Sequence, residues 1–151
     1  MSIANSPQTR GPILSASIKL KIQDILFRLA GIIMFFLGVV FYSIMFTYHT
    51  ADPSFRVATD EIPKNILGQT GSHLADPVHL GLGLSYFLII LIIFFWSWRL
   101  SFDKTKRIFI GRIIFFPIPL ATFSIFLSTY PPSEGWQFSY GLGGIFGDTI
   151  L

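Results

Sequence analysis

The 151-residue sequence predicts an all-α membrane protein with three complete transmembrane helices, the start of a fourth, and a cytoplasmic N-terminus. Three observations support this fold class. Charged residues make up 13% of the chain, about half the share of a typical soluble domain. Three runs of 20 to 22 residues contain no Asp, Glu, Lys or Arg, which is long enough to cross a bilayer. The basic residues are distributed unevenly among the segments that separate these runs.

The N-terminal region is expected to consist of a polar tail, residues 1–17, followed by the membrane domain, residues 18–151. From Ile18 onward, apolar residues recur at helical spacing, which predicts a short interfacial helix before the first span. The first span covers residues 29–48. Its apolar stretch exceeds the roughly 7–15 residues of a signal peptide, and no small-residue cleavage site follows, so we interpret it as a retained anchor.

The segment after the first span, residues 49–76, is a long loop that holds four of the eight acidic residues. Asp52, Pro53 and Ser54 predict a turn just outside the span, because Asp and Pro favour turns. Gly68 and Gly71 predict a second turn region before the next span.

The second and third spans are predicted at residues 77–98 and 113–130. Pro117 and Pro119 predict a kink in the third span, because proline removes a backbone hydrogen bond. Such a kink serves either helix packing or a discontinuous helix at a transport site. We favour packing, because no charged residue lies nearby.

Residues 136–151 resemble the opening of a fourth span that the chain does not complete, and Asp148 lies inside it. Gly143, Gly144 and Gly147 stand in this segment. The spacing from Gly143 to Gly147 is that of a GxxxG motif, which lets helices approach closely.

The distribution of basic residues predicts the topology. Four precede the first span, two lie in the first loop, five lie between the second and third spans, and none follows the third. The positive-inside rule therefore places the N-terminus and the second loop in the cytoplasm. The same placement explains the net charge of +3, so we expect no direct contact between this chain and nucleic acid.

Nothing in the sequence predicts a catalytic, cofactor or metal site. The histidines His49, His73 and His79 lack metal-binding spacing, and the chain has no cysteine. The sequence contains no GxxxxGK[ST] phosphate loop. The complete spans contain no Asp, Glu, Lys or Arg, which argues against an ion pathway. We therefore expect no enzymatic activity, no cofactor and no small-molecule substrate.

Four short motifs, in the same order and spacing over residues 24–151, resemble the N-terminal four-helix membrane domain of bacterial DNA translocases of the FtsK/SpoIIIE family. The motif residues are Asp52-Pro53-Ser54 after the aromatic Tyr48, Asn65 with Gly68, Gly71 with Ala75-Asp76, and Gly143-Gly144 with Gly147. The resemblance implies structural roles for these residues and not catalytic ones.

The resemblance further implies a membrane-anchoring and assembly region of a cell-division DNA translocase in the bacterial inner membrane, at the septum. Its partners would be the lipid bilayer, further copies of itself and other division-septum membrane proteins. ATP hydrolysis and DNA translocation are not carried over, because the motor's phosphate loop is absent from these 151 residues. Two alternatives stay open, namely a small transporter or channel subunit and a non-functional gene fragment.

Overall fold

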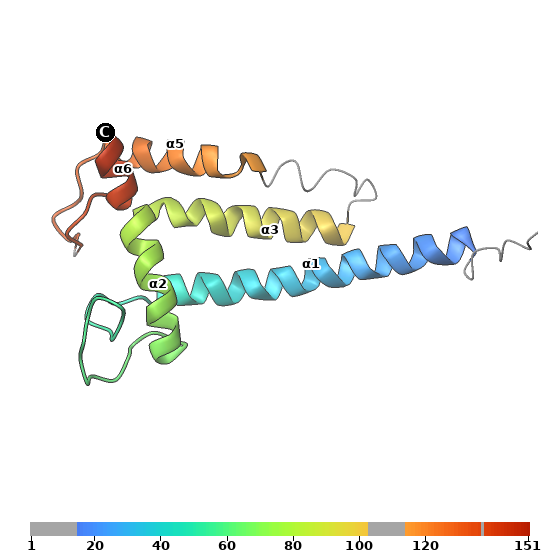
Figure 1. Ribbon diagram of the computed structural model, residues 1–151, viewed down its shortest axis with the longest axis horizontal. Helices are drawn as coiled ribbons and strands as arrows, with labels where there is room; N and C mark the ends of the chain where they lie inside the picture. Colours follow the sequence, from blue (N-terminus) through green and yellow to red (C-terminus); the bar gives the residue numbers. More distant parts are fainter. Residues whose placement is uncertain (1–14, 103–113, 137) are drawn as a thin grey trace, which may run out of the picture.

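The computed structural model describes residues 15–102, 114–136 and 138–151, and within these ranges it contains helices and no strand (Figure 1). The elements are α1 (Ala16–Phe46), α2 (Gly68–Leu82), the 3-10 turn η1 (Gly83–Ser85), α3 (Tyr86–Phe102), α5 (Pro117–Ser128) and α6 (Gly144–Ile150). Two stretches, residues 17–46 and 68–102, are long and apolar enough to cross a membrane, and α5 is a shorter apolar helix. The all-helical prediction is thus confirmed, whereas the number of spans stays a prediction.

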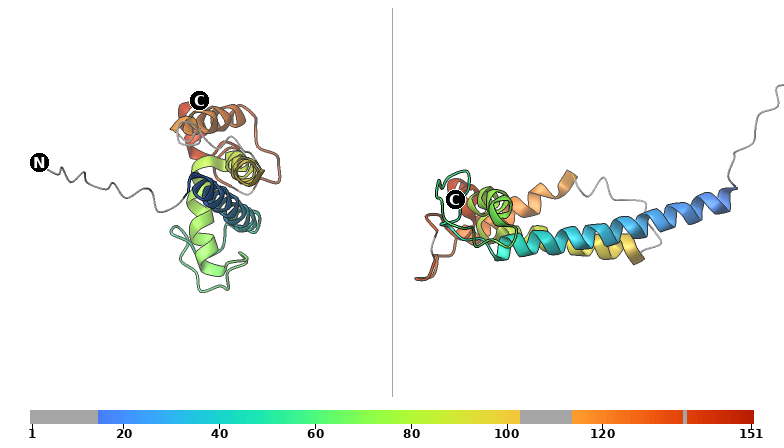
Figure 2. Two further views of the ribbon diagram at one scale, coloured as in Figure 1. Left: turned by 90° about the vertical axis from the view of Figure 1, so that its right-hand side faces the viewer. Right: turned by 90° about the horizontal axis from the view of Figure 1, so that it is seen from below.

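Helices α1 and α3 lie side by side along most of the length of α3 (Figures 1 and 2). Gly31 and Gly38 of α1 allow the close approach, because a Cβ at either position would lie less than 3.0 Å from atoms of α3. Ser97 Oγ of α3 also donates a hydrogen bond of 2.8 Å to the carbonyl oxygen of Gly31. At about 1.5 Å per residue, α1 is roughly 46 Å long and α3 roughly 25 Å. The separate interfacial helix and first span expected from the sequence form one continuous helix of 31 residues.

The segment expected as the second span is not one continuous helix, and its bounds as a span stay a prediction. The structure does not continue one helix over residues 77–98, because the chain bends at Gly83, whose φ of 53° and ψ of −135° are accessible mainly to glycine. Helix α2 ends there and crosses the end of the α1–α3 pair (Figure 1). The expected second turn region is also corrected, since residues 66 and 67 form the turn and Gly71 lies inside α2.

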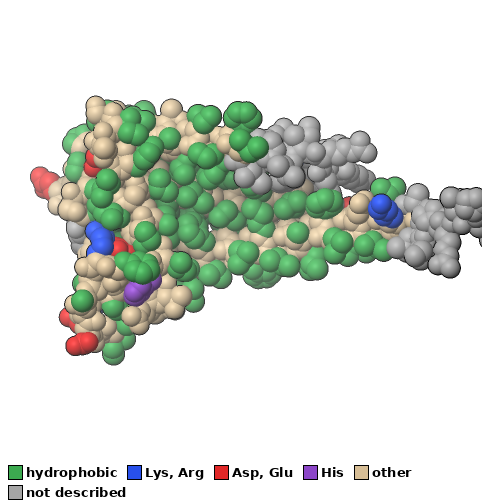
Figure 3. Space-filling view, viewed as in Figure 1, with side chains coloured by type: hydrophobic (Ala, Val, Ile, Leu, Met, Phe, Trp, Pro, Cys, Tyr) green, Lys and Arg blue, Asp and Glu red, His purple; other side chains and the backbone are tan. Residues whose placement is uncertain are grey.

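The buried core is small and lies where α1, α2 and α3 meet. Its members are Ile44, Met45, Ala75, Tyr86 and Ile90. Away from this junction, large apolar side chains cover the outside of the helices (Figure 3). Leu37 on α1 and Leu91 on α3 are 62% and 65% exposed. Such a continuous apolar surface is what contact with a lipid bilayer requires.

The C-terminal helices are shorter than the segments expected as the third and fourth spans, whose bounds stay predictions. Residues 114 and 115 are helical, residue 116 forms a turn, and Pro117 begins α5, so the chain breaks before the prolines. Proline suits this first position because its missing N–H would have no helical partner there. In the segment expected to open a fourth span, only residues 144–150 are helical. Residues 1–14, residues 103–113 with four of the basic residues, and residue 137 lie outside the described part.

Candidate functional site

Six polar residues gather where α2 crosses the end of α1, and we call them the polar cluster. They are Tyr48, Asp52, Arg56, Asn65, Ser72 and Asp76. Four of them, Asp52, Asn65, Ser72 and Asp76, are buried. Because a buried polar group without a partner is costly, the hydrogen bonds of this cluster determine how the loop folds onto the helices.

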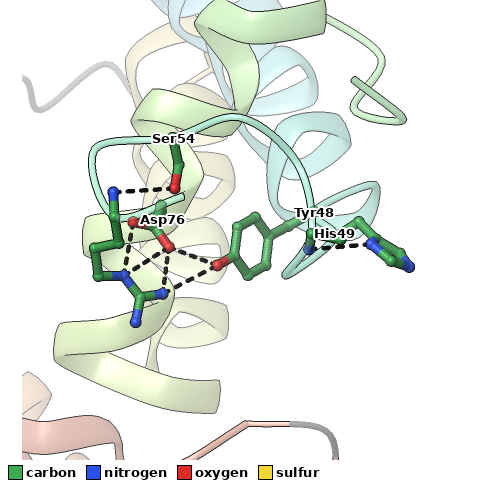
Figure 4. Close-up of polar contacts among 6 residues, drawn as sticks. Tyr48, His49, Ser54 and Asp76 are labelled. Atoms are coloured by element: carbon green, nitrogen blue, oxygen red, sulfur yellow. Dashed lines mark hydrogen bonds and ion pairs between the residues drawn. The ribbon is translucent and has the colours of Figure 1, made fainter. Parts of the chain in front are cut away.

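Asp76 on α2 is the centre of one half of the cluster (Figure 4). Its Oδ1 accepts a hydrogen bond of 2.6 Å from the Tyr48 hydroxyl. Arg56 Nε donates to Asp76 Oδ2 at 2.9 Å, and Arg56 Nη2 donates to Asp76 Oδ1. Asp76 is 2% exposed, so its charge depends on these partners. The forked contact ties the loop after α1 to the middle of α2.

The cluster also shifts the ionisation of its loop members. Burial, followed by the hydrogen bond to Asp76, raises the pKa of the Tyr48 phenol above its ordinary value. The Tyr48 hydroxyl therefore stays protonated and remains a donor. The hydrogen bond to Asp76 likewise raises the pKa of Arg56, which keeps the guanidinium charged.

Asp52 is the centre of the other half. Its carboxylate accepts hydrogen bonds from the backbone N–H groups of Lys64 and Asn65 at 3.0 and 2.9 Å, and from Ser72 Oγ at 3.2 Å. The side-chain amide of Asn65 in turn donates to the Ile44 carbonyl oxygen of α1 at 2.8 Å. Asp52 thus does more than form the predicted turn, because it closes the loop of residues 52–65 onto α2.

The structure brings the predicted residues of the first loop and α2 together at this junction. Pro53 is buried beside Asp52, and Ser54 Oγ accepts a hydrogen bond of 3.3 Å from the Arg56 N–H. Ala75 is fully buried in the core. Gly71 is packed so closely that an added Cβ would lie 1.9 Å from the Asn65 Oδ1. Gly68 begins α2 with a φ of 58°.

The predicted glycines near the C-terminus form a second site with Gly83, which we call the glycine contact. A Cβ at Gly144 would lie 2.4 Å from the Gly83 backbone nitrogen. A Cβ at Gly143 would lie 2.0 Å from the Ser124 carbonyl oxygen of α5, and Gly147 approaches the same residue. Backbone therefore packs directly on backbone here, and α6 is held against both α5 and the bend after α2.

Sequence reasoning missed several members of the polar cluster. From the sequence, Arg56 is only one of the two basic residues of the first loop, Asn65 is only part of a motif, and nothing marks Ser72. His79, considered from the sequence only as a metal ligand, is 5% exposed, and its ring stacks on the Tyr48 ring with 4.5 Å between the ring centroids. One signal available in the sequence was a basic residue inside a mainly acidic loop.

The hydrogen bonds at this end of the molecule hold the loop against α2. Among the described residues, no three His, Cys, Asp or Glu side chains are grouped so that they could hold a metal ion. The charged and hydroxyl groups of the polar cluster bond to one another or to backbone groups, which fixes the loop and α2. The fold and the site together therefore define a helical membrane region with a loop that hydrogen bonds hold at one end.

The comparison with protein families identifies this region further. Residues 24–151 match the model of the 4TM region of DNA translocase FtsK/SpoIIIE. The chain belongs to this family. No solved structure matches the chain.

Among curated proteins, the chain is similar to several proteins named DNA translocase FtsK. The Caulobacter vibrioides protein is 32% identical over 128 residues, which cover 82% of this chain and 16% of that protein. The Azospirillum brasilense protein is 30% identical over 126 residues, covering 82% and 20%. The Rhizobium meliloti protein is 34% identical over 131 residues, covering 82% and 14%. The chain thus spans between a seventh and a fifth of the length of these relatives.

Proposed function

We propose that this chain is the membrane-anchoring and assembly region of an FtsK-like DNA translocase that acts in chromosome segregation at the division septum. Membership of the 4TM family and the apolar surface of α1 and α3 support the anchoring role. The relatives' motor activity is not assigned to these residues, because the family match covers the membrane region and the sequence lacks a phosphate loop.

The observation that carries the proposal is the separation of charge along the helix pair. Four described basic residues lie at the end opposite α2, namely Lys19, Lys21, Arg28 and Arg99, and two lie at the α2 end, namely Arg56 and Lys64. One described acidic residue, Asp24, lies at the basic end, and six lie at the α2 end, namely Asp52, Asp60, Glu61, Asp76, Glu134 and Asp148. An apolar region flanked in this way is expected to cross the inner membrane with its basic end in the cytoplasm. The polar cluster then lies on the external side.

Reporter fusions test this topology. Alkaline phosphatase fused after Ser72 should be active, and the same enzyme fused after Lys106 should be inactive. Green fluorescent protein at the same two sites should give the opposite pattern. Phosphatase activity after Lys106 but not after Ser72 would reverse the proposed orientation.

The septal role and self-assembly need separate tests. A fluorescent fusion to the N-terminus should concentrate at division sites, and uniform labelling of the envelope would contradict the septal role. Chemical cross-linking of the chain in its own membrane should yield homo-oligomers. A product that stays monomeric at every cross-linker concentration would contradict self-assembly.

A further inference from the structure

Helix α2 runs across the direction in which the chain passes through the bilayer. Helices α1 and α3 lie side by side and define that direction, whereas α2 is turned away from it at the bend of Gly83 (Figures 1 and 2). By length and composition alone, residues 68–102 would pass as one spanning helix of 35 residues. The bend divides this stretch, so that α2 extends along the plane of the bilayer at the end of the α1–α3 pair.

The two sides of α2 have different chemistry. Within α2, Leu74 and Val78 are four residues apart, which places them on one stripe. Leu67 is the residue directly before the helix. Ser72 and Asp76 lie on another side and bond to the polar cluster. An apolar stripe on one side and a hydrogen-bonded polar side on the other are the pattern of a helix at a membrane surface.

The direction of the apolar stripe follows from Val78. Val78 packs against the core cluster together with Phe41, which stands within α1 more than one turn before its end. The stripe therefore faces the membrane-crossing part of α1. Leu74 continues it past the helix pair and is 54% exposed, and Leu67, directly before α2, is 46% exposed. The exposed surface of these two leucines therefore faces the same way as the adjoining lipid-facing surface of α1 and α3.

We propose that α2 is an interfacial helix that lies in the headgroup region of the bilayer, with Leu67 and Leu74 inserted into the phospholipid acyl boundary. The second span is then η1 together with α3, residues 83–102, which is long enough to cross a bilayer. Trp98 and Arg99 near its end suit the opposite interface. This inference rests on the anchoring role of α1 and α3, and it is independent of the septal role and the orientation.

The natural absence of cysteine makes the inference directly testable. Single-cysteine variants Leu67→Cys, Gln69→Cys, Leu74→Cys and Leu91→Cys are labelled with a bimane fluorophore and reconstituted into phosphatidylcholine–phosphatidylglycerol vesicles. Quenching is measured with lipids spin-labelled near the headgroup or deep in the acyl chain, and with aqueous iodide. All four side chains are exposed, so the substitutions leave the fold intact. Gln69 is the matched control, because it lies opposite the apolar stripe between the two leucines.

An interfacial α2 gives a periodic result. The labels at residues 67 and 74 should be quenched by the shallow spin label and shielded from iodide, and the label at 69 should be several-fold more open to iodide. Depth that increases steadily from 67 through 69 to 74 would overturn the proposal and make α2 part of a span. Equal iodide quenching at all three positions, with the label at 91 quenched by the deep spin label, would overturn the interfacial helix alone. If the deep spin label does not quench the fluorophore at residue 91, the anchoring role of α1 and α3 is overturned, and the interfacial helix with it.

Discussion

Replacing Gly144 by alanine should loosen α6 from the rest of the molecule. The new Cβ would lie 2.4 Å from the Gly83 nitrogen and 2.7 Å from the Gly81 oxygen, whereas ordinary contact begins near 3.4 Å. The two backbones would have to separate by roughly 1 Å, and overpacking of this kind costs about 1–3 kcal/mol. The φ of 71° adds about 1–2 kcal/mol for a residue with a Cβ. The expected loss in the free energy of unfolding is therefore about 2–5 kcal/mol.

Thermal unfolding in detergent, followed by tryptophan fluorescence, measures this loss. At about 2–4 °C per kcal/mol for a chain of this length, Gly144→Ala should lower Tm by at least about 4 °C. Gly68→Ala has a positive φ of 58° but no neighbour within 4 Å, so it isolates the backbone strain. Gly81→Ala has neither feature and should leave Tm unchanged or slightly raised. Equal Tm values for Gly144→Ala and Gly81→Ala would refute the close contact between the backbones of Gly144 and Gly83.

Three further predictions concern the polar cluster and the helix pair. Asp76→Asn removes the charge-assisted bonds and should cost about 1.5–3 kcal/mol in the same assay, while the exposed control Asp60→Asn should change little. Because the pKa of Tyr48 is raised in the folded state, its contribution is present below about pH 10 and is lost as pH rises further. Tyr48→Phe should accordingly lower stability at neutral pH and reduce its alkaline decline, and an unchanged alkaline slope would contradict this coupling. The new Cβ of Gly31→Ala would lie 2.9 Å from backbone atoms, whereas that of Gly38→Ala would meet only side-chain atoms. Gly31→Ala should therefore lower Tm more than Gly38→Ala does. The reverse order would contradict this packing of α1 on α3.

The predictions from the sequence succeeded where a single local property decides the outcome. Apolar runs produced helices, and Gly143 with Gly147 marked a close approach between α6 and α5, as GxxxG spacing indicates. The sequence did not predict the helix ends where two effects compete. The run over residues 77–98 is apolar throughout most of its length, yet Gly83 bends it, because its backbone packs against Gly144 some 60 residues later.

The polar cluster shows the same limit. Asp52 and Asp76 were recognised as parts of motifs, but their partners were not. Arg56 is 20 residues from Asp76, and Lys64 and Asn65 are 12 and 13 residues from Asp52. No periodicity relates such positions, since a loop has no fixed repeat. Only a folded loop shows which donor reaches which carboxylate.

The sequence by itself determined the class of this molecule, because hydropathy and charge are sums over residues and do not depend on which groups meet. It indicated an all-helical membrane region, its family and the asymmetric distribution of charge. The tertiary structure decided that α2 crosses the end of the helix pair instead of lengthening α3. That outcome depends on a positive φ at Gly83 and on hydrogen bonds between distant residues, and these form only once the chain is folded.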